Sequence, residues 1–123
     1  MRLTQRYPQA KAIRLDSFAV MGAWATLLLT GIAWLSATAF DLPAGRLAAG
    51  SFVAFFVLAL AHLLLAFRHR CPVCQKRPTL EGFDPVHPDS AGQALFPGWA
   101  GVIVSVVRRK RFCCIHCGTA FSV

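Results

Sequence analysis

The sequence predicts a membrane α-helical hairpin of two transmembrane helices, followed by a small C-terminal β module built around cysteines. Three observations support this fold class: two long stretches without charged residues, a short turn between them, and five cysteines that all follow the second stretch. Of the 123 residues, 56% are hydrophobic and only 15% are charged. Soluble domains carry about 25% charged residues, so the composition excludes an ordinary soluble globule, and a disordered chain or a coiled coil as well.

The two apolar stretches are residues 17–40 and 47–67, and neither contains Asp, Glu, Lys or Arg. At about 1.5 Å per residue, helices of these lengths reach about 36 Å and 32 Å, enough for a hydrocarbon core of about 30 Å. Lipid cannot hydrogen-bond the backbone, so each span must be helical. The six residues 41–46 contain Pro and Gly and can join only antiparallel neighbours. Residues 17–67 are therefore predicted to form a hairpin.

The basic residues give the predicted orientation of this hairpin. The net charge is +8, and the Lys and Arg residues lie mostly outside the outer ends of the two spans. The N-terminal segment 1–16 holds four of them, the loop 41–46 holds one, and Arg68 and Arg70 open the tail. Positive residues stay on the cytoplasmic side, so we expect an integral membrane protein of a bacterial inner membrane, with both termini cytoplasmic.

Two other interpretations of the apolar stretches are less favoured. Residues 1–16 and the small residues at 37–39 resemble a signal peptide and its cleavage site, but the apolar part of a signal peptide spans about 7–15 residues, and this one has 24. A buried soluble hairpin would need a larger protein around it than 123 residues can provide.

Small and polar residues inside the spans suggest where helices meet. Gly22, Thr26 and Thr30 repeat every four residues, and such a stripe lets another helix approach closely, either within the hairpin or from a partner. His62 is the one ionisable side chain within the two spans. We expect its neutral ring to bond to a threonine, a carbonyl group or a partner subunit.

The cysteines form two CxxC motifs, CPVC at 71–74 and CIHC at 114–117, separated by the 39 residues 75–113, and Cys113 directly precedes the second motif. Two intervening residues let a tight turn direct both sulfurs at one ion, and two such turns make a tetrahedral sulfur site that suits Zn²⁺. Spacing alone leaves the second pair open: Cys114 with Cys117, or Cys113 with His116. A cytoplasmic location keeps thiols reduced, which disfavours disulfides.

The segments CPVC and CIHCGTAF resemble the two knuckles of a zinc ribbon, the rubredoxin-like class, with strands from RRKRF and TAFSV around the second knuckle. The resemblance covers residues 71–83 and about 106–123. It implies a β zinc ribbon over residues 68–123. Gln75 departs from it, because many first knuckles carry Gly there, and the long gap implies an inserted loop at 84–101. The ligands it implies are Cys71, Cys74, Cys114 and Cys117.

A ribbon of this size is expected to need its metal for stability. Residues 68–123 are too few to form a comfortably stable domain alone, and metal ligation supplies folding free energy to such units. Zn²⁺ is therefore expected as a structural cofactor, while iron at the same cysteines would make an electron-transfer site. Cys113 is expected to point away from the metal, and His116 to be an exposed knuckle residue.

The segment before the second knuckle combines an apolar patch, a β-branched run and a basic run. Residues 102–107, VIVSVV, are predicted to form a ribbon strand. The patch and the basic run have three interpretations: a solvated, charge-flanked strand, a contact with anionic lipid at the membrane surface, or a contact with nucleic acid. The residues concerned are Phe96, Trp99, Arg108, Arg109, Lys110 and Arg111.

The sequence contains no catalytic constellation. GxSxG, P-loop and HExxH motifs are absent, and a metal with four protein ligands leaves no position for a substrate. We expect a non-catalytic accessory or assembly subunit of a larger membrane protein complex, in contact with membrane lipid and other membrane subunits and without an evident small-molecule substrate. The alternatives are a rubredoxin-like electron-transfer protein with iron and, with nucleic acid as the least favoured partner, a membrane-tethered nucleic-acid-binding zinc ribbon.

Overall fold

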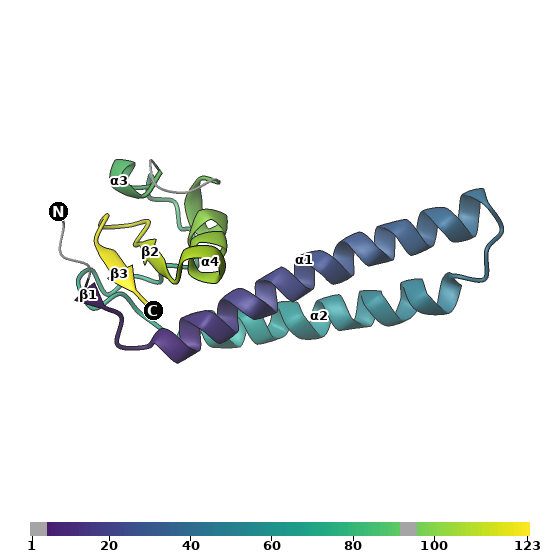
Figure 1. Cartoon of the computed structure of the whole chain (residues 1–123), viewed down its shortest axis with the longest axis horizontal. Helices are drawn as coiled ribbons and strands as arrows, with labels where there is room; N and C mark the ends of the chain where they lie inside the picture. The colour runs from purple at the N-terminus through teal and green to yellow at the C-terminus, as the bar shows by residue number, and fades with distance from the viewer. Residues whose placement is uncertain (1–4, 92–95) are drawn as a thin grey trace.

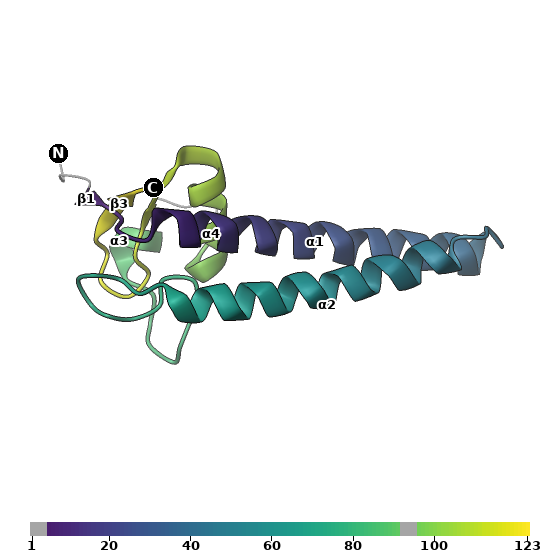
Figure 2. The same cartoon turned by 90° about the horizontal axis from the view of Figure 1, so that it is seen from below.

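The computed structural model describes residues 5–91 and 96–123. Two long helices form an extended hairpin, and the remaining elements gather at its open end, as two views show (Figures 1 and 2). In chain order, the elements are β1 (Gln5–Arg6), α1 (Ala10–Ala39), α2 (Gly45–Arg68), α3 (Pro88–Ala91), α4 (Gly98–Arg109), β2 (Arg111–Cys113) and β3 (Ala120–Ser122).

The two predicted apolar helices are confirmed. Both α1, with 30 residues, and α2, with 24, are long and apolar enough to cross a membrane. Helix α1 begins seven residues before the uncharged stretch, at Ala10. The most apolar windows of the two helices are only 22% and 11% buried, whereas the core helix of a soluble protein is mostly buried. Large apolar side chains such as Leu28 and Trp34 point outward along the hairpin.

The stripe of small residues on α1 lies against α2. A Cβ added to Gly22 would lie 3.1 Å from a methyl group of Leu58, so the absence of a side chain lets the helices approach closely. The hydroxyl group of Thr30 lies 2.8 Å from that of Ser51 on α2. Thr26 bonds back to the carbonyl group of Gly22 at 3.0 Å, which satisfies its hydroxyl within α1.

A small mixed sheet with the strand order β1-β3-β2 lies beside the open end of the hairpin. Strands β2 and β3 pair antiparallel, with Phe112 opposite Phe121. Strand β3 falls within the predicted segment TAFSV, whereas β2 shares only its first two residues with the predicted strand RRKRF, because α4 extends to Arg109. Strand β1 pairs parallel to β3, with Gln5 opposite Phe121. The sequence did not indicate β1, because two polar residues show no alternation of apolar and polar side chains.

The core at this end is shared by the sheet, α4 and the first turns of α1. The rings of Tyr7, Phe112 and Phe121 meet edge to face or tilted, with centroids 5.2–5.6 Å apart. Around them lie other buried side chains, including Ile13, Val102, Val106 and Ile115. The N-terminal segment thus packs into the same core as the cysteines rather than lying apart from it.

The prediction of a strand at residues 102–107 is wrong, because this segment lies within helix α4. β-branched residues favour strands only weakly, and tertiary packing overrides that preference. Residues 98, 102 and 106 repeat every four positions and are all buried, as a helix that packs on one face requires. The expected loop at 84–101 contains α3 and the first turn of α4, and residues 92–95 lie outside the described part.

Candidate metal centre

Four cysteine sulfurs converge at one point of the fold. Cys71, Cys74, Cys114 and Cys117 place their Sγ atoms within 4.8 Å of one another. Between the two motifs, Cys71 lies 3.7 Å from Cys117, and Cys74 lies 3.8 Å from Cys114. A tetrahedral ion with four sulfur ligands at about 2.3 Å requires sulfur–sulfur distances of about 3.8 Å. The donor set therefore fits a single tetrahedral ion held by thiolates.

The two knuckles, residues 71–76 and 114–119, have the same backbone geometry. In the first, the amide of Gln75 donates to the carbonyl of Cys71 and the amide of Cys71 donates to the carbonyl of Lys76, both at 2.9 Å. In the second knuckle, the amide of Gly118 donates to the carbonyl of Cys114, and the amide of Cys114 donates to the carbonyl of Thr119, again both at 2.9 Å. Gln75 adopts a φ of 60°, and Gly118 a φ of 69°. Gln75 thus occupies the left-handed position that glycine occupies in the second knuckle.

His116 joins the second knuckle to the loop that follows the first. Its Nε2 atom lies 3.1 Å from the carbonyl oxygen of Arg77 and 3.2 Å from that of Leu80, and its ring is half-buried. The expectation that His116 is exposed is wrong, because these two carbonyl groups face the knuckle and need a donor. A second ring, that of His87, lies where a Cβ of Gly118 would otherwise project.

The thiols differ in how their surroundings affect ionisation. Burial raises the pKa of the Cys71 thiol and of the Cys114 thiol above the usual range. Burial acts to raise the pKa of Cys117, but hydrogen bonds with Thr119, Cys71 and Cys74 together lower it below the usual range. An ion that binds here must therefore displace protons from the more buried thiols.

Cys113 lies outside the group of four sulfurs. It belongs to β2 and is 8% exposed, whereas the neighbouring Cys114 is fully buried and joins the cluster. Successive side chains of a strand point to opposite faces, so these two residues separate at the end of β2. The pair that the structure brings together with Cys71 and Cys74 is Cys114 with Cys117, and the pairing of Cys113 with His116 is not formed.

A buried charge network next to the cysteines was not predicted. Asp16 of α1 is fully buried and accepts hydrogen bonds from two histidine rings, 2.5 Å from Nδ1 of His62 and 2.9 Å from Nε2 of His69. His69 is also fully buried, two residues before the first cysteine ligand, and Thr79 lies 3.4 Å from the same Nε2 atom. The network therefore joins α1 and α2 to the start of the first knuckle.

The hairpin geometry contained a signal for this network. Residues at equal distances from the turn lie side by side in an antiparallel hairpin, and with the turn near residue 43 that places Asp16 beside the end of α2, near His69. The hydrogen-bond partner of His62 within residues 5–91 and 96–123 is this carboxylate, whereas we had expected a threonine, a carbonyl group or a partner subunit. A buried carboxylate is stable only when its oxygens are hydrogen-bonded, so the histidines account for its presence there.

Further contacts connect the N-terminal segment with both ends of the cysteine-containing region. The hydroxyl group of Tyr7 donates to the carbonyl of Arg70 at 2.9 Å, and the amide of Arg70 donates to the side chain of Gln9 at 3.0 Å. The guanidinium group of Arg14 donates to the carbonyl of Val123 at 2.5 Å. The four-sulfur cluster is therefore fixed to the base of the hairpin from several directions.

The predicted surface residues divide into two groups. Trp99 packs inward, with its ring 5.9 Å from those of both Trp24 and His62, so it joins α4 to the hairpin. Phe96 is half exposed. The basic run lies where α4 passes into β2, and its four residues are exposed: Arg108 and Arg109 end the helix, Lys110 turns with a φ of 53°, and Arg111 begins the strand.

Comparison of the chain with protein-family models, with curated proteins and with solved structures found no match. The resemblance to a zinc ribbon therefore rests on the two cysteine motifs and their geometry.

Removing one ligand is expected to abolish stoichiometric metal binding. Cys71→Ser replaces a thiolate with a hydroxyl group, which is a poor ligand for a thiophilic ion. The matched control is Cys113→Ser, which leaves all four clustered sulfurs in place. Metal analysis of the purified chains should find about one ion per chain in the control and far less in Cys71→Ser. Equal metal content in the two variants would contradict the ligand set.

The shared knuckle geometry predicts opposite effects at its two left-handed positions. A residue with a Cβ in this region is destabilised by about 1–2 kcal/mol, and at Gly118 the added atom would also meet His87. Gly118→Ala should therefore weaken metal binding at least about fivefold, whereas Gln75→Gly should leave it unchanged or strengthen it. Competition with a chelator measures both, and weakening by both variants would argue against equivalent turns.

The buried carboxylate is expected to stabilise the base of the hairpin. A buried hydrogen-bonding group that loses its partner costs about 1–3 kcal/mol, and more when the group is charged, so Asp16→Asn should lower the melting temperature in detergent by several degrees. Asp41→Asn is the matched control, because Asp41 is exposed in the turn at the far end. If the two variants melt at the same temperature, the network does not stabilise the fold.

Proposed function

We propose that this chain is a non-catalytic accessory or assembly subunit of a larger membrane protein complex. In this proposal, α1 and α2 cross the membrane, and the four cysteines hold Zn²⁺ in a structural zinc ribbon on the cytoplasmic face. The observation that carries the proposal is the attachment of a closed four-sulfur site to the base of an apolar hairpin.

The exposed surface of the hairpin supports membrane anchoring. Apolar side chains such as Leu28, Val57 and Leu64 are more than 60% exposed, and they are distributed over both helices. Soluble proteins rarely expose contiguous apolar surface of this extent, whereas lipid or neighbouring membrane helices cover it at no cost. The basic residues at the open end of the hairpin favour placing that end in the cytoplasm.

The donor set supports a structural rather than a catalytic metal. Four protein sulfurs complete a tetrahedral shell, so no ligand position remains for a substrate or an activated water. Two acidic side chains near the site are already engaged, Asp16 by two histidines and Asp84 by Lys76. Zn²⁺, when bound, supplies a cross-link between the two knuckles, and folding free energy with it.

An electron-transfer function is the alternative that the site also accommodates. Iron accepts four thiolates in the same arrangement, and Cys74 and Cys117 are partly exposed, which would allow electrons to reach the site. Iron in stoichiometric amounts with visible charge-transfer absorption would favour this alternative over structural zinc.

Co-purification tests the proposed function. The full chain, tagged in the exposed stretch around Phe83, should be isolated from its native membrane in mild detergent together with defined membrane proteins at fixed stoichiometry. Replacing the exposed Leu28 and Leu64 with Ala should reduce this recovery without disturbing the core. Replacing the buried Ile115 with Ala disturbs the core, so it shows the loss of recovery that damage to the fold alone produces. A chain that behaves as a free monomer under these conditions would argue against a role as a subunit.

A further inference from the structure

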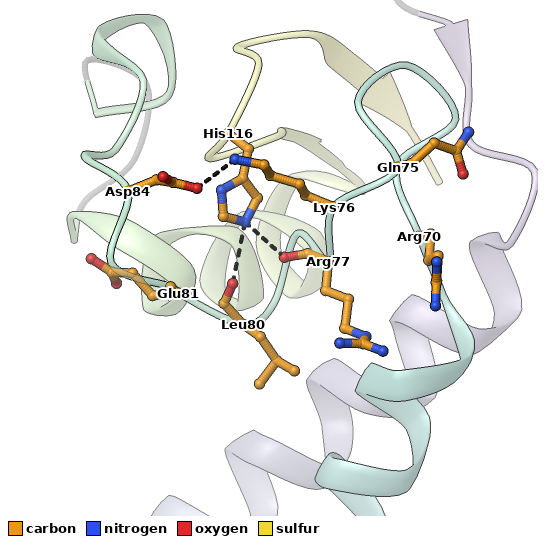
Figure 3. A pocket seen from close by; sticks show the side chains of 9 residues that line it. Arg70, Gln75, Lys76, Arg77, Leu80, Glu81, Asp84 and His116 are labelled. Atoms are coloured by element: carbon orange, nitrogen blue, oxygen red, sulfur yellow. Dashed lines mark hydrogen bonds and ion pairs between the residues drawn. The ribbon is translucent and has the colours of Figure 1, made fainter.

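An open pocket of about 310 Å³ lies between the first knuckle and the loop that follows it. Its walls carry three basic side chains, Arg70, Lys76 and Arg77, and two acidic ones, Glu81 and Asp84. Figure 3 shows that the pocket adjoins the end of α2, the point at which this helix would leave the membrane. Basic residues at the end of a membrane-spanning helix lie at the depth of the lipid headgroups, and Arg70 and Arg77 occupy this position.

Arg77 is held at this boundary by an aromatic ring. Its guanidinium carbon lies 4.2 Å from the centre of the Phe67 ring, and Phe67, 56% exposed, is the last apolar residue of the uncharged stretch in α2. A cation over an aromatic face is stabilised without losing its hydrogen-bond donors. The Nε atom of Arg77 is buried and has no hydrogen-bond partner within residues 5–91 and 96–123.

The side chain of Arg70 lies on the same side of the pocket as that of Arg77. Figure 3 shows the guanidinium groups of Arg70 and Arg77 on the side of the pocket that faces the end of α2. The main chain of Arg70 is fixed on both sides, by Gln9 at its amide and Tyr7 at its carbonyl. The exposed side chain therefore extends from a rigid position.

The acidic side chains of the pocket have other contacts. Asp84 forms an ion pair with Lys76 on the far side of the pocket (Figure 3). The carboxylate of Glu81 lies against Gly98 at the N-terminus of α4, where the helix dipole favours a negative charge. Among the residues that the structure describes, neither carboxylate forms an ion pair with Arg70 or Arg77.

We infer that Arg70 and Arg77 bind the phosphate group of an anionic phospholipid of the cytoplasmic leaflet. The two guanidinium groups supply forked donors that match phosphate oxygens, and Phe67 borders the acyl chains below them. This inference rests on the proposed membrane anchoring of α2. The bound lipid would fix the depth of the four-cysteine site relative to the membrane surface.

Native mass spectrometry tests the site on the full chain. The protein is reconstituted in nanodiscs of equal amounts of phosphatidylcholine and phosphatidylglycerol, and the lipid that stays bound after release is identified. The wild-type chain should retain one phosphatidylglycerol, and Arg70→Gln with Arg77→Gln should reduce that retention at least about tenfold, because two charge-assisted hydrogen bonds are lost. Arg6→Gln with Lys11→Gln removes the same charge from exposed positions outside the pocket and should retain the lipid.

Three results would overturn the inference: equal retention by all three chains, equal loss in both variants, or equally strong binding of inorganic phosphate to the wild-type chain in pure phosphatidylcholine. If the variant with both Arg70→Gln and Arg77→Gln also loses its metal, the lipid retention of the single variant Arg77→Gln is measured instead. Loss of lipid with the metal retained supports the lipid site, and any other result overturns it. Extraction of the wild-type chain from native membranes by alkaline carbonate would overturn the membrane anchoring as well, whereas failure of lipid selectivity alone leaves the anchoring intact.

Discussion

The convergence of four cysteine sulfurs is the constraint on which the arrangement at the open end of the hairpin depends. The two knuckles are far apart in the sequence, and the sheet, α4 and the first turns of α1 pack around them in one small core. A core of this size buries little apolar surface. An ion held by the four sulfurs would therefore stabilise an arrangement that the aromatic contacts of Tyr7, Phe112 and Phe121 alone hold only weakly.

Polar contacts add to the apolar packing that attaches this core to the hairpin. A single carboxylate, that of Asp16, links two helices through His62 and His69, and it does so where the apolar stretches begin. Hydrogen bonds in a region of low dielectric are strong, so these contacts hold the start of the first knuckle against the base of the hairpin. The ring of Trp99 closes the same junction from the side of α4.

The sequence predicted the features that depend on local pattern or short spacing. Uncharged stretches identified α1 and α2, and the two CxxC motifs identified the sulfurs that cluster. The same reasoning failed for residues 102–107, because β-branched composition suggested a strand, while burial on one face made a helix. It also missed β1 and the role of Asp16. Both depend on contacts between segments distant in sequence, and no local pattern specifies those contacts.

The order of strands in the sheet has a consequence for biosynthesis. Strand β3 lies between β1 and β2, so it covers Tyr7 on one side and completes the pairing of Phe112 on the other. A ribosome must therefore finish residues 120–122 before the N-terminal segment can take its place. During that interval α1 and α2 are already synthesised, so the hairpin can form before β1 pairs with β3.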